Sequence, residues 1–274
     1  MSSPLIKESE ACLADIPDNL MGVLTDVDGT LTREGRLQAS TYEALWSLHE
    51  SGLTIIPVTG RSAAWAHMML HHWPINAVIA ESGGVALWRS HRLGSSAATK
   101  SKTHTKFFAE PGARERLVAF AEHCMAGSAP LRWANDHCQR LIDVAIDWNE
   151  EVSAPLSVVE RFVGVLRNKG YSAHVSNVHI NAWAGTFDKA STCLHLLNLL
   201  YGQTPEEAKA RWFFIGDAPN DESMFACFPH HVAVQGPEHF AGRVQHMPQR
   251  YAIAKASEGF DIWAQAIQRA MRSP

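Results

Sequence analysis

Leu20–Thr32 has the sequence LMGVLTDVDGTLT, in which two carboxylates, Asp26 and Asp28, directly follow a short apolar run. The Asp-Gly pair alone is typical of a turn, because Asp caps its own backbone and Gly accepts a positive φ. The other carboxylate, Asp26, lies outside this pair and has no such explanation. Side chains two residues apart on an extended chain point the same way, so the two carboxylates crowd one place. Like charges that close together raise a pKa or recruit a cation.

The composition of the 274-residue chain favours a protein that works on small molecules. Hydrophobic residues make up 46% of the chain and charged residues 19%, which is enough to bury the core of one large domain or two modest ones. The 24 basic and 28 acidic residues give a net charge of −4, which leaves no electrostatic footprint for nucleic acid or an anionic membrane. We therefore expect neither as a partner; the oligomeric state stays open.

Cysteine spacing and the N-terminal residues favour a cytoplasmic protein. The five cysteines are scattered and include no CxxC pair, so neither a zinc site nor a disulfide framework is predicted. Reduced thiols in the cytoplasm are the simplest interpretation. Residues 1–17 lack the apolar segment of a signal peptide, and we interpret them as a leader before the first strand.

The order of apolar runs and helix boundaries predicts an α/β fold. Strands are expected at 22–25, 53–58 and 77–80, with helices between them, the first of which should begin at a Ser40–Glu43 capping box. Further strands are expected at 211–217, 231–234 and 251–254, with a last helix after Gly259. This alternation is typical of a parallel sheet wrapped by helices.

The residues between these two halves have a different character. Residues 90–110 are polar, small and basic, which indicates a boundary or a mobile loop. A self-contained α+β unit of roughly a hundred residues follows them. We therefore predict a leader at 1–17, a core domain made of 18–88 and 184–274, and an inserted domain at 89–183.

Polar residues end three strands of the predicted core, where the carboxyl ends of parallel strands bring ligands together. These residues are Asp26 and Asp28, Thr59, and Asp217 with Asp221. Lys189 opens the helix after the insertion and can reach the same edge. Four carboxylates in one pocket are costly without a cation. An all-oxygen set without His or Cys prefers a hard ion, and one that keeps waters and shares a phosphate is most like Mg²⁺.

The same residues stand in a known set of motifs. DVDGTLT, VTGRS, the lysine of TFDKAST and GDAPNDESMF have the order and spacing of the four motifs of the haloacid dehalogenase superfamily. The resemblance covers 18–90 and 184–270 and implies a Rossmann-like parallel-sheet core. The insertion resembles the α/β cap of the subgroup that holds sucrose-phosphate, trehalose-phosphate and mannosylphosphoglycerate phosphatases and phosphomannomutases.

The resemblance implies a role for each matched residue. Asp26 would be the nucleophile that forms an aspartyl-phosphate. Asp28 would protonate the leaving oxygen and then deprotonate the attacking water. Thr59 and Lys189 would hold the phosphoryl oxygens, and Asn220 would donate to the phosphate.

The resemblance also implies the metal ligands. Mg²⁺ would be bound by Asp26, the backbone carbonyl of Asp28 and Asp217, with Asp221 as a further ligand or a support for the others. Ala218 departs from the family, because relatives often have a small hydroxyl residue after the metal-binding Asp. We interpret Glu81 as a link between core and cap.

Arg61 either contacts phosphate or fixes its loop through a salt bridge, and we expect the salt bridge.

The resemblance thus implies a Mg²⁺-dependent phosphomonoester hydrolase that acts on a small phosphorylated metabolite, a sugar or glycosyl phosphate. Dehalogenase chemistry is disfavoured, because expelling a halide needs no general acid such as Asp28. Two alternatives stay open. One is a phosphosugar mutase with the same first half-reaction, and the other is a sugar-phosphate-binding protein without turnover.

The cap is expected to select the substrate, because core motifs do not encode it. A predicted strand at 177–183 alternates polar and apolar residues, so its polar members share one face. They are Asn177, His179, Asn181 and Trp183. Amides, an imidazole and an indole suit the hydroxyls and apolar ring face of a sugar. A solvated outer face of the cap sheet explains the same pattern equally well.

Overall fold

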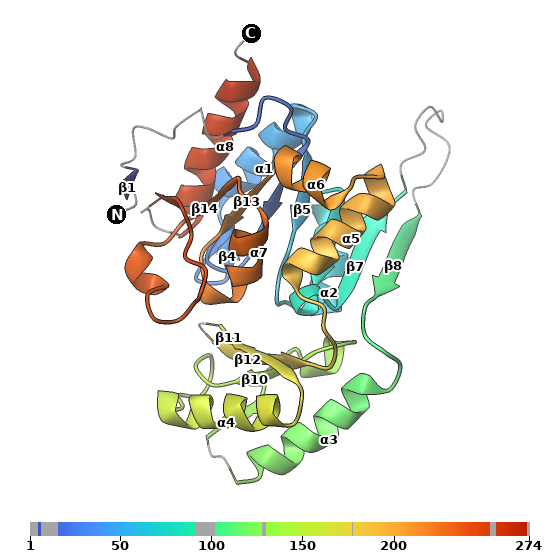
Figure 1. Ribbon diagram of the computed structural model, residues 1–274, viewed down its shortest axis with the longest axis vertical. Coiled ribbons are helices and arrows are strands. Elements are labelled where there is room, and N and C mark those ends of the chain that lie inside the picture. Colours follow the sequence, from blue (N-terminus) through green and yellow to red (C-terminus); the bar gives the residue numbers. More distant parts are fainter. Residues whose placement is uncertain are drawn as a thin grey trace.

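The computed structural model describes residues 5–6, 16–90, 102–127, 130–176, 178–252 and 256–272. Its largest sheet has the strand order β1-β15-β14-β13-β2-β5, and all neighbouring strands in it run parallel. These strands are β1 (Leu5–Ile6), β2 (Gly22–Thr25), β5 (Thr54–Pro57), β13 (Trp212–Gly216), β14 (His231–Ala233) and β15 (Tyr251–Ala252). The predicted parallel-sheet core is confirmed (Figure 1).

Helices cover both faces of this sheet, because alternate residues of each buried strand point to opposite sides. Val23 and Phe213 pack in one apolar cluster, with α1 (Ala39–Glu50), α2 (Ala63–His72) and α8 (Ala256–Arg272). Leu24 and Phe214 pack in a second cluster, with α5 (Lys189–Tyr201), α6 (Pro205–Arg211) and α7 (Glu222–Cys227). The near-continuous apolar runs in β2 and β13 follow from burial on both faces.

Two helix starts differ from the prediction. α1 begins at Ala39, with Gln38 as an N-cap whose side chain makes no capping hydrogen bond, so the Ser40–Glu43 capping box does not form. This N-cap residue follows directly on β4 (Arg36–Leu37), which forms a small hairpin with β3 (Thr32–Arg33), so the helix begins where the hairpin ends. α8 begins before Gly259, where a Cβ would lie 2.8 Å from Val234 Cβ. That glycine permits close packing of the helix and does not mark its start.

An antiparallel sheet extends the core beyond β5. β6 (Ala77–Ala80), β7 (Val85–Arg89) and β8 (Thr103–Phe107) pair in that order, and a parallel bridge between Val58 and Ile79 joins them to the main sheet. β8 lies in the segment predicted as a boundary or loop. Its Thr, His and Lys residues are at least partly exposed and form no apolar run that would indicate a strand. We therefore propose that the inserted unit begins after β8, near residue 110, and not at 89.

The inserted unit is an antiparallel sheet with two helices, as the predicted α+β cap requires. The sheet has the order β11-β12-β10-β9, formed by β9 (Arg132–Trp133), β10 (Val144–Asp147), β11 (Ser172–Val175) and β12 (His179–Trp183). α3 (Ala113–Met125) and α4 (Leu156–Asn168) cover one face of it and bury a separate apolar cluster. The other side of the cap sheet is turned toward the core (Figure 1).

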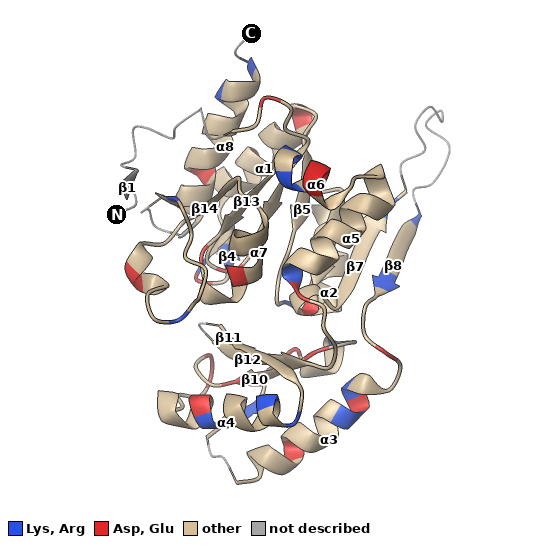
Figure 2. Cartoon of the chain, in the orientation of Figure 1, with Lys and Arg blue, Asp and Glu red and all other residues tan. Residues whose placement is uncertain are grey.

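Charged residues of both signs are mixed over the described chain (Figure 2). Helices α3, α4 and α6 each carry acidic and basic side chains. Among the described residues, no helix combines the length and apolarity needed to cross a membrane.

Glu81 joins the core to the cap. It follows β6 and is fully buried. Its carboxylate accepts a hydrogen bond from the backbone N–H of Ala63, at the start of α2, at 2.8 Å. It also accepts from three consecutive cap N–H groups, of Leu141, Ile142 and Asp143, at 2.6 to 3.0 Å. The interpretation of Glu81 as a core–cap link is confirmed.

The joint requires an unusual backbone. Glu81 and Ser82 have φ values of 50° and 58°, in the left-handed region that residues other than glycine rarely adopt. Such a conformation persists only where its surroundings fix it. Here the four N–H groups on the Glu81 carboxylate supply that constraint.

We expect Glu81→Gln to lower the free energy of unfolding by about 2–4 kcal/mol, because one amide oxygen cannot replace a carboxylate that accepts from four buried N–H groups. Urea denaturation followed by circular dichroism measures the change. The matched control is Glu115→Gln on the exposed side of α3, which should change stability by less than about 0.5 kcal/mol. An equal loss in both variants would contradict the assignment.

Candidate active site

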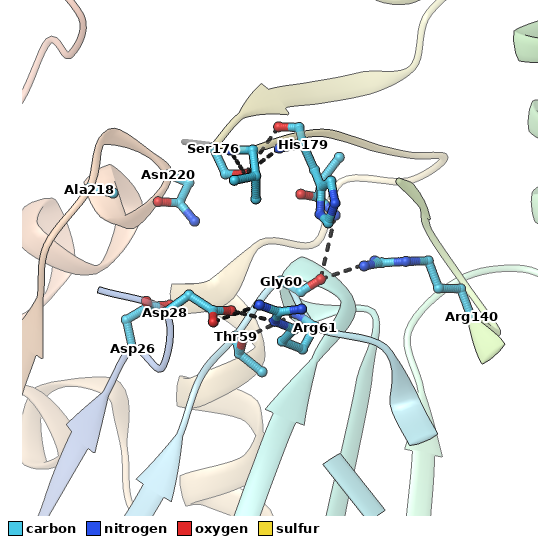
Figure 3. Close-up of a pocket in the computed structure, with 12 residues that line it drawn as sticks. Asp26, Asp28, Thr59, Gly60, Arg61, Arg140, Ser176, His179, Ala218 and Asn220 are labelled. Atoms are coloured by element: carbon cyan, nitrogen blue, oxygen red, sulfur yellow. Dashed lines mark hydrogen bonds and ion pairs between the residues drawn. The ribbon is translucent and has the colours of Figure 1, made fainter. Parts of the chain in front are cut away.

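The site lies where the strands of the parallel sheet end. β2 lies between β13 and β5, so the loops that carry Asp26, Asp217 and Thr59 emerge side by side. A pocket opens between these loops and the cap sheet (Figure 3). It is lined by Asp26, Asp28, Thr59, Gly60, Arg61, Arg140, Ser176, Val178, His179, Asn181, Ala218 and Asn220.

Three carboxylates cluster at the base of this pocket. Asp26, Asp217 and Asp221 are buried, and one oxygen of each lies within 4.8 Å of the others. The Thr30 hydroxyl donates to Asp217 Oδ1 at 3.2 Å. Gly29 has a φ of 91°, and a Cβ there would lie 2.2 Å from Asp217 Oδ2. The Asp-Gly pair therefore serves more than a turn, because only glycine lets this loop approach Asp217.

Lys189 lies among these carboxylates. Its Nζ donates to Asp26 Oδ1 at 2.7 Å and to Asp221 Oδ1 at 2.6 Å. The lysine is the first residue of α5, whose start is fixed by a capping box between Asp188 and Ser191. The cap insertion therefore returns to the core just before the residue that supplies the buried cation.

Asp221 is engaged through both of its oxygens. Oδ1 accepts from Lys189, and Oδ2 accepts from the backbone N–H groups of Asp217 and Ala218 at 3.2 and 3.3 Å. The carboxylate therefore holds the lysine and the loop after β13 in place. Ala218 contributes its backbone to this arrangement, which needs no side-chain hydroxyl.

The cluster is short of positive charge. Burial raises the pKa of Asp26 to about 7, although Lys189 lowers it. Burial, with the charges of Asp26 and Asp221, raises the pKa of Asp217 well above its ordinary value. Burial disfavours the charged form of Lys189, but Asp221 and Asp26 outweigh it and raise its pKa. Buried oxygen donors with raised pKa values fit a hard divalent cation, which relieves their repulsion.

Asp28 and Arg61 form a bidentate ion pair at the side of the pocket. Arg61 Nε lies 2.7 Å from Asp28 Oδ2, and Nη2 lies 2.9 Å from Oδ1. The guanidinium also lies over the ring of Trp65, 5.4 Å from its centroid. The expected salt bridge of Arg61 is confirmed, and its partner is the residue expected to act as acid and base.

The phosphate-binding residues of the prediction lie around the same pocket. Thr59 is buried, and its Oγ1 accepts from the Arg61 N–H at 3.1 Å. Asn220 lines the pocket from the turn after β13, and its Oδ1 has no hydrogen-bond partner among the described residues. The structure thus brings Asp26, Asp28, Thr59, Lys189 and Asn220 together with the carboxylate cluster.

The predicted substrate face of the cap is divided. Asn177 lies outside the described residues. His179 and Asn181 line the pocket, with His179 Nε2 2.8 Å from Glu150 Oε2. Trp183 does not line it. Its indole packs in the core cluster and donates to the Phe187 carbonyl at 2.9 Å, because β12 ends there and the chain passes into the core.

Sequence reasoning missed a buried charge cluster in the cap. Arg140 is paired with Asp136 Oδ1 at 2.9 Å and with Asp143 Oδ1 at 2.7 Å, and its side chain has no exposed surface. Arg140 lies in the segment before β10, which begins at Val144. The spacing of one Arg between two Asp residues, four before and three after it, is the sequence feature that could have indicated this cluster.

We expect Lys189→Met to destabilise the metal-free protein, and more so at pH 8 than at pH 5. A carboxylate with a raised pKa costs stability as pH rises from its unfolded value toward its folded value. For Asp26 that window runs from 3.8 to about 7, and loss of the ammonium raises the upper limit. The expected loss is about 3–5 kcal/mol at pH 8, where the carboxylates are left without their partner.

Urea denaturation in EDTA at both pH values measures this loss. The control is Lys102→Met, an exposed lysine of the core. A loss independent of pH would contradict the assigned charge states.

Comparisons with known proteins find a matching family model and solved structures with a similar fold. Residues 23–109 match the model of a family described as haloacid dehalogenase-like hydrolase. A solved structure from Thermoplasma acidophilum is 18% identical, with a TM-score of 0.67 over 92% of this chain and 98% of that one. The C-terminal domain of C. albicans trehalose-6-phosphate phosphatase is 13% identical, with a TM-score of 0.69 over 97% and 98%.

The sucrose-phosphatase of Synechocystis, solved with sucrose and phosphate, is 13% identical, with a TM-score of 0.59 over 92% of this chain and 98% of that one. At these identities the structures establish a shared fold, and the family match adds the sequence pattern of the first motifs. The predicted resemblance is therefore confirmed: residues 23–109 match the haloacid dehalogenase-like hydrolase family, and the chain shares the fold of the solved phosphatases.

Proposed function

We propose that the protein is a Mg²⁺-dependent phosphomonoester hydrolase that acts on a small phosphorylated metabolite, a sugar or glycosyl phosphate. The observation that carries the proposal is the buried cluster of Asp26, Asp217 and Asp221 around Lys189, next to a pocket that Asp26 lines together with residues of the cap. A nucleophilic carboxylate, an adjacent cation and an acid–base carboxylate are the groups that phosphoryl transfer through a covalent intermediate needs.

In the first step, an Asp26 oxygen attacks phosphorus while the bond to the leaving oxygen breaks. The products are an aspartyl-phosphate and the free alcohol, whose oxygen takes its proton from Asp28. Lys189 and Thr59 hold the phosphoryl oxygens during the transfer. The Lys189 Nζ, now 2.7 Å from Asp26 Oδ1, is already next to the position that the phosphoryl group must take.

In the second step, water attacks the phosphorus of the aspartyl-phosphate and gives a proton to Asp28. The bond between phosphorus and the Asp26 oxygen breaks, which releases inorganic phosphate and restores the carboxylate. Arg61 does not block this role. Asp28 Oδ1 accepts from Arg61 and, at 3.5 Å, from the Thr32 hydroxyl, whereas Oδ2 accepts from Arg61 alone among the described residues and keeps a second site for a proton. The pair instead fixes the direction in which Asp28 faces the pocket.

The residues present fit Mg²⁺. The carboxylates of Asp26 and Asp217 and the backbone carbonyl of Asp28 would hold the ion. When bound, the ion supplies positive charge that offsets the carboxylates and the phosphoryl group. Asp221, with both oxygens engaged, is placed to hold Lys189 and the Asp217 backbone and not to contact the ion directly.

A sugar phosphate is the substrate class that several observations support. The chain is acidic overall, with a net charge of −4, which disfavours a polyanionic polymer. The cap side of the pocket presents Ser176 and the His179–Glu150 pair, which are hydrogen-bonding groups suited to hydroxyls. Trehalose-6-phosphate and sucrose phosphatases are among the proteins that share the fold.

Phosphate release from a panel of sugar phosphates, nucleotides and phosphopeptides tests the proposal. Hydrolysis should be fastest for a sugar or glycosyl phosphate. Isomerised sugar phosphate without released phosphate would identify a mutase. Binding without any turnover would identify a sugar-phosphate-binding protein.

We expect Asp26→Asn to lower kcat by about 10³-fold or more, because the amide keeps the side-chain volume but is not a nucleophile. EDTA should abolish the activity of the unaltered protein, and Mg²⁺ should restore it. Circular dichroism checks that the variant is folded. Normal turnover by the Asn variant would sink the mechanism.

Asp28→Asn should slow hydrolysis most for poor leaving groups. A sugar alkoxide needs a proton as it leaves, whereas an activated aryl phosphate needs little help. We expect a loss of about 10²–10⁴-fold for a sugar phosphate and a much smaller loss in the first step with p-nitrophenyl phosphate. Burst-phase kinetics separate this step from the hydrolysis of the intermediate. Equal losses in the first step would make Asp28 a structural residue.

A further inference from the structure

The loop Thr59–Gly60–Arg61 is held at three consecutive backbone carbonyls. The Ser82 N–H donates to the Thr59 carbonyl at 3.2 Å, and the Glu81 N–H donates to the Arg61 carbonyl at 3.0 Å. Both donors belong to the turn after β6, within the core. The partners of the middle carbonyl, that of Gly60, come from the cap.

Two cap side chains donate to the Gly60 carbonyl. Arg140 Nη1 lies 3.0 Å from this oxygen, and Asn181 Nδ2 lies 3.4 Å from it. Figure 3 shows the contact between Arg140 and the Gly60 carbonyl. The two donors come from different parts of the cap, Arg140 from the segment before β10 and Asn181 from β12.

Asp143 orients both donors. One of its oxygens accepts from Arg140 at 2.7 Å and the other from Asn181 at 3.1 Å. Its own backbone N–H donates to Glu81 at 3.0 Å, which ties the same residue to the core. Asp136 accepts from Arg140 through both oxygens, at 2.9 and 3.0 Å. A carboxylate that binds a donor with each oxygen fixes where the remaining N–H groups point.

We propose that Arg140 and Asn181 are positioning residues that clamp the Gly60 carbonyl and thereby couple docking of the cap to the geometry of the phosphate site. This inference rests on the proposed function. Thr59, on one side of Gly60, lines the pocket where the phosphoryl group would bind, and Arg61, on the other side, holds Asp28. A displacement of this one carbonyl therefore moves a phosphate-binding group and the acid–base group together.

The clamp gives Asn181 a different role from the one expected from sequence. Its amide hydrogens are directed at Asp143 and Gly60, so they are not available to a sugar hydroxyl. Loss of a residue that binds the sugar lowers the hydrolysis rate only of substrates that reach the cap. A positioning residue affects the chemical step for every phosphate ester.

Asn181→Leu separates these two roles. The leucine keeps the volume but removes both hydrogen bonds. We expect kcat to fall roughly 10- to 100-fold, by the same factor for the best sugar phosphate of the panel and for p-nitrophenyl phosphate, because small misplacements at a reacting centre have effects of this size. KM should change little, since the interaction acts on the transition state. A loss confined to the sugar phosphate, or no loss, would overturn the proposal.

Two further variants complete the comparison. Arg140→Lys keeps the charge between Asp136 and Asp143 but cannot present the same fork of donors, so kcat should fall for both substrates in a folded protein. The matched control is Asn135→Leu. Asn135 is an exposed cap residue that donates to Glu151 within the cap, and its loss should leave kcat unchanged. A wholly structural role of Asn181 would lower the urea midpoint without lowering kcat per folded molecule, which would also overturn the proposal.

A readout without turnover distinguishes failure of the clamp from failure of the proposed function. If the unaltered protein hydrolyses no phosphate ester, the proposed function fails. Amide hydrogen exchange at residues 59–62 still tests the clamp, and exchange there should be faster in Asn181→Leu than in Asn135→Leu. Equal exchange in the two variants would overturn the clamp whatever the activity.

Discussion

Buried carboxylates that repel one another are the constraint around which this protein is arranged. The sheet order places the loops after β2 and β13 side by side, so Asp26 and Asp217 cannot avoid each other. Burial removes the water that would screen them. Lys189, in the first turn of α5, supplies a positive charge that offsets this repulsion. Asp221 accepts hydrogen bonds with both oxygens and holds the lysine in place. The remaining imbalance of charge is what makes the site suited to a cation and a phosphoryl group.

The parts of the site that follow from topology could be predicted from the sequence. Carboxyl ends of parallel strands meet at one edge, so the convergence of Asp26, Thr59 and Asp217 required only that their strands be recognised as parallel. Lys189 was predicted from the motif order, and it lies between the carboxylates of Asp26 and Asp221. These features depend on the order of elements along the chain, which the sequence contains.

Features that depend on contacts between distant segments could not be predicted in the same way. β8 is a polar edge strand, so no apolar run marks it. Trp183 continues the alternation of β12 and yet packs in the core, because the chain leaves the cap at that residue. Arg140 and Asn181 meet at Gly60 only once the cap is docked, and nothing local to either residue indicates it.

The joint at Glu81 has a consequence for how such proteins diversify. Among the described residues, its carboxylate hydrogen-bonds to the cap through the backbone N–H groups of residues 141–143, which every amino acid except proline supplies. Glu81 therefore does not recognise the side chains of those residues, and this joint needs only the path of the main chain there. Cap residues that face the ligand can therefore be substituted while the joint at Glu81 still attaches the cap to the core. The joint at Glu81 constrains the backbone path of residues 141–143 and not the identity of their side chains.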